Sequence, residues 1–287
     1  MTKRHLFMVL LASLVLFALS RLDHHSLIYS LRQIPLWLIF LLLSIQVLTQ
    51  LLISLQWYKI ANISRVILTF RKMFYINCQG ALVDAITPGV KFGGEVTRAI
   101  QLSRLTGCTT EQAAAIVAIQ KFFSLSAMCL ILIFSFSQFF GLLLLVVLIV
   151  LIAVGLLYWK RPSFLTLIKS NLAEIKKDKK ACVFLASLSL FIWVLYPIKL
   201  ILIVQLFAPF VSNFATARAA FTAYVVAMIP IFPGGLGGFE ASLSALLVAL
   251  GVVVYDAAVI TIIFRFITFW FVVILGLFVV LFNKKLC

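Results

Sequence analysis

Charged residues are scarce in this chain of 287 residues: they make up 11% of the sequence, and only 8 of them are Asp or Glu. So little polar sequence leaves no room for a soluble catalytic domain. The sequence also contains no P-loop, no HExxH motif and no Ser-His-Asp arrangement, which argues against an ATP-driven pump and against a protease. We therefore expect the chain not to be an enzyme and assign no catalytic residue.

Metal-binding patterns are missing as well. Five cysteines are present, and none stands in a CxxC or other metal-ligand spacing: Cys78, Cys108, Cys129, Cys182 and Cys287. We interpret them as packed or lipid-facing thiols rather than as a disulfide framework. His24 and His25 follow Asp23, but two histidines without further ligands are weak grounds for a metal site. The sequence predicts neither a metal nor another cofactor.

Apolar residues, by contrast, make up 64% of the chain, and the mean hydropathy is +1.21. Lipid can solvate this much apolar surface, whereas a soluble domain of this size could not bury it. The net charge of +16 comes from basic residues that flank the apolar runs, as the positive-inside rule describes. These residues would face anionic headgroups. We therefore expect the partners to be membrane lipids, and no nucleic acid.

The apolar runs predict an all-α, polytopic helical membrane protein with about six full spans. They are residues 6–19, 34–55, 111–137, 139–159, 181–207 and 257–282. The first run also resembles a signal peptide, but in a polytopic protein we favour an uncleaved first helix. Basic residues after Tyr58 and throughout 160–180 mark the cytoplasmic side. The prediction is one integral domain, residues 1–287, in the cell inner (cytoplasmic) membrane with both termini in the cytoplasm.

Two glycine-rich stretches interrupt the apolar segments. The first runs from Pro88 to Glu95 and the second from Pro233 to Glu240. Each opens with Pro-Gly, contains more glycine, and places a Glu seven positions after the proline. Broken backbone at membrane depth survives only where protein buries it or where it lines a polar cavity. The stretches therefore mark either a functional feature or two coincidental helix-breaking loops.

Topology favours two re-entrant helical hairpins with the glycine stretches at their tips. Residue 59 and the loop 160–180 are expected on the same side of the membrane, and the spans 111–137 and 139–159 already make one round trip between them. The segments 64–86 and 93–105 must therefore begin and end on one side. The same argument applied to the second half gives a hairpin with the opposite orientation in the membrane. Residues 34–137 and 181–287 are then inverted repeats, with 1–33 as the first helix and loop and 138–180 as the connection. Such repeats are typical of transporters.

The two stretches resemble a known family. Thr87-Pro88-Gly89, Gly93-Gly94-Glu95-Val96-Thr97-Arg98 and the run from Pro233 to Glu240 are similar to the lysylphosphatidylglycerol synthase transmembrane region, the flippase-like domain of the multiple peptide resistance factor family. Arg265 resembles the arginine of the family's last conserved helix. The full-length synthases carry a soluble C-terminal domain that this chain lacks, so we expect no aminoacyl transfer. Gln120-Lys121-Phe122-Phe123-Ser124 replaces the family's acidic-basic signature.

A glycine-rich turn that leads into a helix exposes backbone N–H groups and the positive end of the helix dipole, which suits a lipid phosphate. The candidate substrate-binding residues are Pro88, Gly89, Gly93, Gly94, Glu95, Arg98, Lys121, Pro233, Gly234, Gly235, Gly237, Gly238, Glu240 and Arg265. With the two tips meeting near the midplane, they predict binding or translocation of an anionic phospholipid or a polyprenyl-phosphate-linked lipid. The alternative is a membrane subunit or scaffold for a separately encoded enzyme that modifies lipid headgroups. A homo-oligomer is also compatible with the sequence.

Several charged side chains have two interpretations. Glu95 and Glu240 either cap their own helices or act as intramembrane acids that contact an amino headgroup or carry a proton. Arg265 stands near the middle of its span, so we expect it to pair with Glu95, Glu240 or Asp256. For Lys199 and Arg218 we favour snorkelling to a membrane interface.

Overall fold

The computed structural model describes residues 30, 32–87, 92–135, 162–228 and 235–282. Within these ranges the chain is helical and contains no strand, which confirms the all-α class. Among the described residues, four helical segments are long and apolar enough to cross a membrane: α3 (Leu36–Ile63), α6 (Thr110–Ser135), α9 (Lys179–Phe207) and the run Val254–Phe282. The last consists of α12 (Val254–Arg265), the π-helix η2 (Phe266–Trp270) and α13 (Phe271–Phe282). The predicted spans 6–19 and 139–159 lie outside the described residues.

Short helices lie between the long ones. α4 (Phe70–Ile86) and α5 (Phe92–Thr106) follow α3, and α10 (Asn213–Ala227) and α11 (Gly238–Ala249) follow α9. At 1.5 Å per residue, helices of this length rise about 18–26 Å, less than the roughly 30 Å of a bilayer core. The order long, short, short, long therefore occurs in both halves. The insertion of the short pairs as re-entrant hairpins and the inverted orientation of the halves remain predictions.

Side-chain caps mark where two of these helices begin. α10 begins at Asn213, and the Ser212 hydroxyl before it accepts a hydrogen bond from the Ala215 N–H. Thr109 caps α6: its hydroxyl accepts from the Gln112 N–H, and the Gln112 side chain accepts from the Thr109 N–H. The apolar stretch 239–254 breaks after α11, and α12 starts at Val254.

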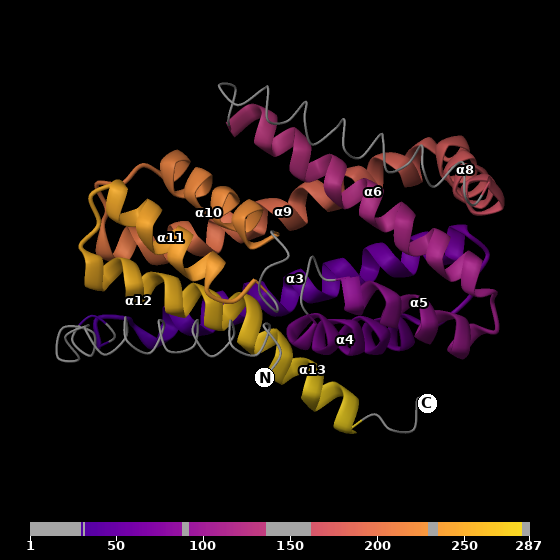
Figure 1. The fold of residues 1–287 in the computed structure, drawn as a ribbon, viewed down its shortest axis with the longest axis horizontal. Helices are drawn as coiled ribbons and strands as arrows, with labels where there is room; N and C mark the ends of the chain where they lie inside the picture. The colour runs from indigo at the N-terminus through magenta and orange to yellow at the C-terminus, as the bar shows by residue number, and fades with distance from the viewer. Residues whose placement is uncertain (1–29, 31, 88–91, 136–161, 229–234, 283–287) are drawn as a thin grey trace, which may run out of the picture.

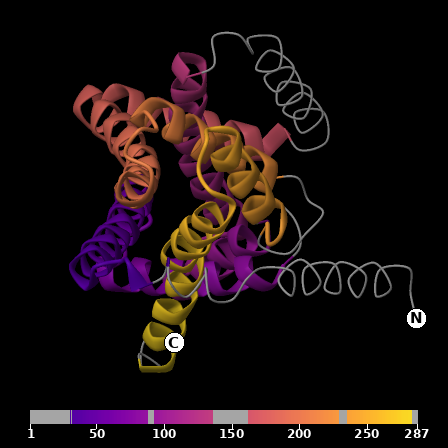
Figure 2. The ribbon, with the colours of Figure 1, turned by 90° about the vertical axis from the view of Figure 1, so that its left-hand side faces the viewer.

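The core has two parts, which divide the molecule along its length (Figure 1). One lies among α10, α11, α12 and the first half of α3, around Leu42, Phe239 and Phe264. The other lies among α4, α5, α6, α8 (Pro162–Lys177) and the second half of α3, around Ile76 and Ile119. The long helices α3 and α9 run through both parts and lie side by side (Figure 2). Each half thus holds its own pair of short helices against shared long ones.

The end of the chain joins the two halves. α13 packs against α4, and Gly276 of α13 lies so close that an added methyl group would stand 3.2 Å from the Cys78 carbonyl oxygen. Gly276 is also the one buried residue of α13, whose other side chains are more accessible. This contact brings the last predicted span against the helix that supports the first glycine stretch.

Candidate functional site

Four charged side chains meet where α4, α5 and α6 pack together; we call them the first ion cluster. The guanidinium of Arg98 lies 3.2 Å from the Asp84 carboxylate and 2.9 Å from that of Glu95. The Lys121 Nζ lies 2.6 Å from the same oxygen of Glu95, Oε1. Glu95 and Arg98 are three residues apart on α5, which places them on one face of that helix. Glu95 is therefore shared by two cations.

Glycines make this close approach possible. A methyl group on Gly94 would overlap the Asp84 carboxylate, and one on Gly80 would stand 2.6 Å from the Arg98 guanidinium. The Gly94 N–H instead donates a hydrogen bond to Asp84 Oδ1 over 2.9 Å. A carboxylate on the neighbouring helix thus satisfies a free N–H at the start of α5 and faces the positive end of its dipole. Gly93 similarly leaves room for the side chain of Thr87.

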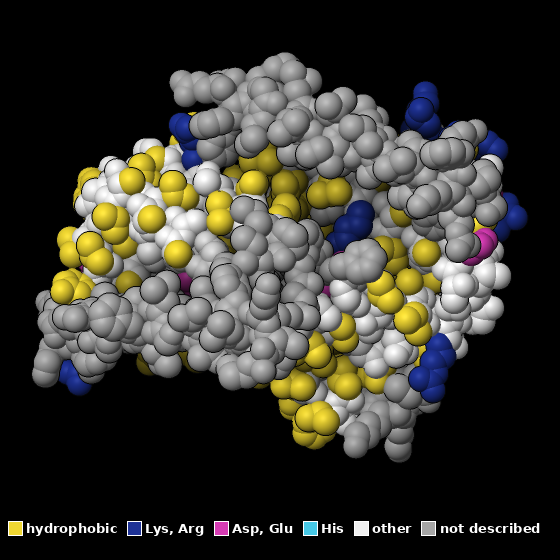
Figure 3. Space-filling view, viewed as in Figure 1, with side chains coloured by type: hydrophobic (Ala, Val, Ile, Leu, Met, Phe, Trp, Pro, Cys, Tyr) yellow, Lys and Arg dark blue, Asp and Glu magenta, His cyan; other side chains and the backbone are white. Residues whose placement is uncertain are grey.

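The first ion cluster balances two cations with two carboxylates. The side chains of Asp84, Glu95 and Arg98 are only 9–12% exposed, whereas that of Lys121 is 38% exposed. Charges this far from water interact strongly, and each needs its partner. Lys121 is the member of the cluster that an outside ligand reaches most easily. In Figure 3 a basic side chain is visible in the middle of the face, near α6, with hydrophobic side chains around it.

The second ion cluster consists of Glu240 and Arg265. Glu240 Oε2 accepts a hydrogen bond of 2.7 Å from the Gly237 N–H, so Glu240 caps its own helix, as one interpretation of the sequence expected. Gly237 has a φ of 83°, a conformation in which a side chain is strained. The other oxygen, Oε1, lies 2.8 Å from Arg265 Nε. Of the three expected partners of Arg265, Glu240 is confirmed, while Asp256 accepts from the Ser30 hydroxyl.

Aromatic rings enclose Arg265. Its guanidinium lies 5.0 Å from the ring centre of Phe239 and 4.3 Å from that of Phe269, which are favourable cation–π distances. Arg265 ends α12, and the π-helix begins with the next residue. Single-turn π-helical segments often occur at functional sites because they change which residues share a helix face. Here Phe269 of the π-helix is brought against the cation.

The structure places most of the candidate residues in or beside these two clusters. Glu95, Arg98 and Lys121 belong to the first, with Gly93 and Gly94 beside it at the start of α5. Glu240 and Arg265 form the second, with Gly237 and Gly238 beside it at the start of α11. Gly235 packs against the end of α10 at Ala227 and has a φ of 69°. Pro88, Gly89, Pro233 and Gly234 lie outside the described residues, so the meeting of the two tips remains a prediction.

Sequence reasoning missed Asp84 as a member of the site. Asp84 was not among the candidate binding residues, yet it binds both Arg98 and the first turn of α5. A carboxylate in a short apolar helix beside a glycine break was the available signal. A chain of buried amides was also missed: the Gln120 amide donates to Gln56, and the Gln56 amide donates to Ser189 on α9. Gln120, the first residue of this hydrogen-bonded series, directly precedes Lys121 in α6.

The snorkelling expected of Lys199 is wrong. Its side chain is completely buried, and Nζ donates hydrogen bonds to Gln46 Oε1 and Thr49 Oγ1 of α3. The ammonium also lies 4.4 Å from the ring centre of Tyr196. A lysine in the middle of a long helix that packs on another helix finds these partners nearer than the membrane surface. Arg218 is half-buried on α10, with its guanidinium 6.0 Å from the Phe214 ring centre.

Comparison with known proteins agrees with the resemblance carried by the glycine stretches. Residues 6–276 match a family described as "Lysylphosphatidylglycerol synthase TM region". A "UPF0104 membrane protein" of Methanothermobacter thermautotrophicus is 26% identical over 267 residues, which cover 78% of this chain and 79% of that protein. The matched region includes every residue of the two ion clusters.

Proposed function

The chain belongs to the lysylphosphatidylglycerol synthase TM region family, and we propose that it binds an anionic lipid in the cytoplasmic membrane and moves it between the leaflets. The lipid is a phospholipid or a polyprenyl-phosphate-linked lipid. One observation carries the proposal: each half places a Glu–cation ion pair at the start of its second short helix. Ionisable groups within a membrane region are costly and mark pathways for polar cargo.

Partner exchange is the chemistry that the first ion cluster supports. Its charges balance, so an anionic headgroup enters only by taking the place of a carboxylate. A phosphate diester offers oxygens that a guanidinium binds in the same fork geometry as a carboxylate. Lys121 is half-exposed and receives the phosphate first; Arg98 then exchanges Glu95 for it while Asp84 stays in place. Glu95 is the group that the headgroup displaces.

The second ion cluster supports the same exchange of a carboxylate for a headgroup, but its cation is held by additional contacts. Arg265 is held over two aromatic rings, which stay in contact with the cation when its carboxylate partner leaves. Glu240 keeps the Gly237 N–H as a partner throughout. The acyl chains remain in lipid, because only the headgroup needs the polar groups.

The test is lipid translocation in proteoliposomes with headgroup-labelled phosphatidylglycerol and, separately, a polyprenyl phosphate. Wild type is compared with Glu95→Gln, Glu240→Gln and Arg265→Ala, each shown to be folded by thermal unfolding. The matched control is Glu111→Gln, an exposed carboxylate in the first turn of α6. We expect movement by wild type and the control, and loss of movement in folded Glu95→Gln. No movement of either lipid by wild type would overturn the proposal.

A second candidate function rests on the family description, which refers to a synthase. In it, the chain is a membrane subunit or scaffold for a separately encoded enzyme that modifies a lipid headgroup. The same vesicles distinguish the two. A translocator moves lipid without nucleotide, tRNA or a second protein, whereas a subunit acts only after its partner is added.

A further inference from the structure

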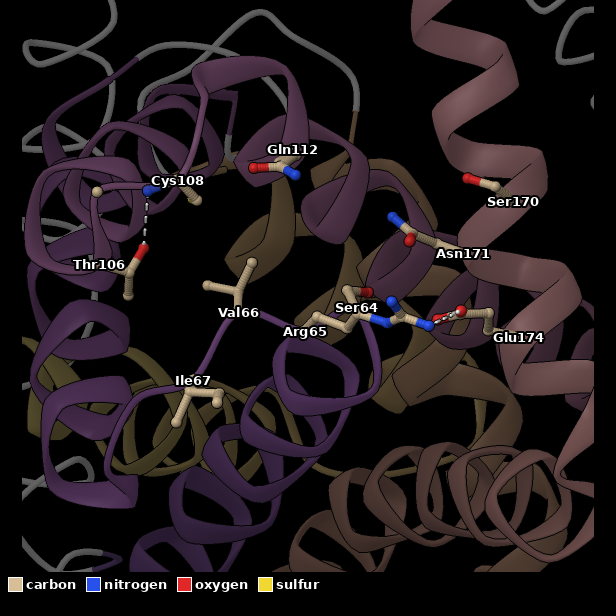
Figure 4. A pocket seen from close by; sticks show the side chains of 11 residues that line it. Ser64, Arg65, Val66, Ile67, Thr106, Cys108, Gln112, Ser170, Asn171 and Glu174 are labelled. Carbon is tan, nitrogen blue, oxygen red and sulfur yellow. Dashed lines mark hydrogen bonds and ion pairs between the residues drawn. The ribbon is translucent and has the colours of Figure 1, made fainter.

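A cavity of about 400 Å³ opens at the end of the first half that carries the basic loops. Four parts of the chain line it: the turn 64–67 between α3 and α4, the turn 106–108 between α5 and α6, Gln112 of α6, and the face of α8 with Ser170, Asn171 and Glu174. Figure 4 shows the Arg65 side chain reaching from the first turn towards Glu174, with Asn171 beside them. None of these residues belongs to the two ion clusters.

Arg65 occupies a backbone position that favours glycine. Its φ is 61°, and it is the one residue other than glycine with a positive φ in the described ranges. The Arg65 N–H donates to the Asn62 carbonyl and the Val66 N–H to the Ala61 carbonyl, the pattern of a Schellman motif that ends α3. Gly107, across the cavity, has a φ of 72° after α5. The chain thus uses glycine at one such turn and a strained arginine at the other, and strain of this kind is often kept for function.

The lining favours a phosphate ester with hydroxyl groups. Arg65 supplies a guanidinium fork, and Gln112, Ser170 and Asn171 supply amide and hydroxyl groups. The carboxylate of Glu174 lies 3.0 Å from the Arg65 guanidinium and forms an ion pair with it. Exposed lysines add positive charge to α8, which lines the cavity, and to the residues that follow it: Lys169, Lys176, Lys177, Lys179 and Lys180.

One apolar residue of the lining is exposed. Ile67 lines the cavity, yet it is 85% exposed to solvent. A polar cavity beside an exposed apolar side chain matches a molecule that has a charged head and an apolar tail. This favours a lipid over a free phosphate ester, which would gain nothing from Ile67.

We propose that this cavity binds the phosphate–polyol headgroup of an anionic glycerophospholipid, with Arg65 exchanging Glu174 for the phosphate. It would be a loading site that takes lipid from the basic side of the protein before the headgroup reaches the first ion cluster. The loading role rests on the proposed function. Lipid binding to the cavity, however, can be measured without any transport.

The test measures equilibrium binding of short-chain phosphatidylglycerol to the purified full-length protein, for wild type, Arg65→Gly and Glu174→Gln. Losing a charged hydrogen-bond donor lowers affinity about tenfold or more, so we expect that loss in Arg65→Gly. Glycine relaxes the strained turn, so this variant should unfold at the same temperature as wild type or higher. Glu174→Gln removes the competing carboxylate, so its affinity should equal or exceed that of wild type.

The two variants separate ligand binding from a structural link between α3 and α8. If Arg65 only ties the turn to α8, both variants break the same ion pair and change binding in the same direction, which would overturn the proposal. Equal affinity for soluble glycerol phosphate would also overturn it, because the apolar residue Ile67 would then play no part. Glu111→Gln, which changes an exposed carboxylate outside the cavity and both ion clusters, should leave this binding unchanged. Loss of transport with intact binding at the cavity would therefore count against the proposed function and not against the loading site.

Discussion

The two ion clusters occupy matching places in the two halves, yet their carboxylates are used differently. Glu240 caps its own helix with one oxygen and holds one cation with the other. Glu95 holds two cations, while Asp84 of the adjacent helix takes the N–H at the start of α5. Because a separate residue does the capping, Glu95 can leave its partners without exposing the helix end. The comparison identifies the first cluster as the more adaptable of the two.

The largest difference is expected when the arginine of each cluster is removed. Arg98→Ala leaves Asp84 and Glu95 buried with less compensation, and breaking a buried ion pair in this way costs about 3–5 kcal/mol. Arg265→Ala leaves Glu240, which is 28% exposed and keeps the Gly237 N–H, so we expect about 1–2 kcal/mol. Thermal unfolding in one detergent measures both. Equal losses would contradict the difference between the clusters.

A smaller effect is expected at glycines that differ in their surroundings. A methyl group on Gly94 overlaps Asp84, so Gly94→Ala must push α4 and α5 apart, at about 2–3 kcal/mol. Gly107→Ala meets open space and suffers only from its φ of 72°, at about 1 kcal/mol. The unfolding temperatures should fall in that order. A milder effect at Gly94 would show that the two short helices are not tightly fixed.

The smallest effect is expected at a buried cation outside both clusters. Lys199 is held by Gln46, Thr49 and the Tyr196 ring rather than by a carboxylate. Lys199→Met keeps the volume and removes the charge, so we expect stability within about 1 kcal/mol of wild type. Lys199→Ala is the control: the cavity it leaves should cost about 2–4 kcal/mol. A large loss in Lys199→Met would mean that the charge itself stabilises the fold.

Much of this arrangement could be predicted because its signals are close together in the sequence. The Glu in each glycine stretch and the cation on the next long helix stand 25 or 26 positions apart, and both of these pairs form ion bridges. The helix breaks were equally visible as Pro-Gly. Local composition and spacing decide such features, since the short helices must fold back between neighbouring spans.

The remaining features depend on contacts between distant residues. Lys199 binds Gln46, which is 153 positions away in the sequence, and no local pattern predicts that this face of α9 packs against α3. Asp84 was missed because both of its partners, the Arg98 guanidinium and the Gly94 N–H, lie on another helix. Arg65 looked like one more basic residue, since a positive φ leaves no mark on the sequence when glycine is not used.

The most direct test of the account is the translocation rate of Glu95→Gln against Glu240→Gln in the same vesicles. Glutamine at position 240 still accepts from the Gly237 N–H, so this variant should keep a measurable rate. Glutamine at position 95 weakens the hold on Arg98 and Lys121 and ends the exchange of charged partners. The account predicts that folded Glu95→Gln moves no lipid above the rate of empty vesicles. A wild-type rate in Glu95→Gln would contradict it.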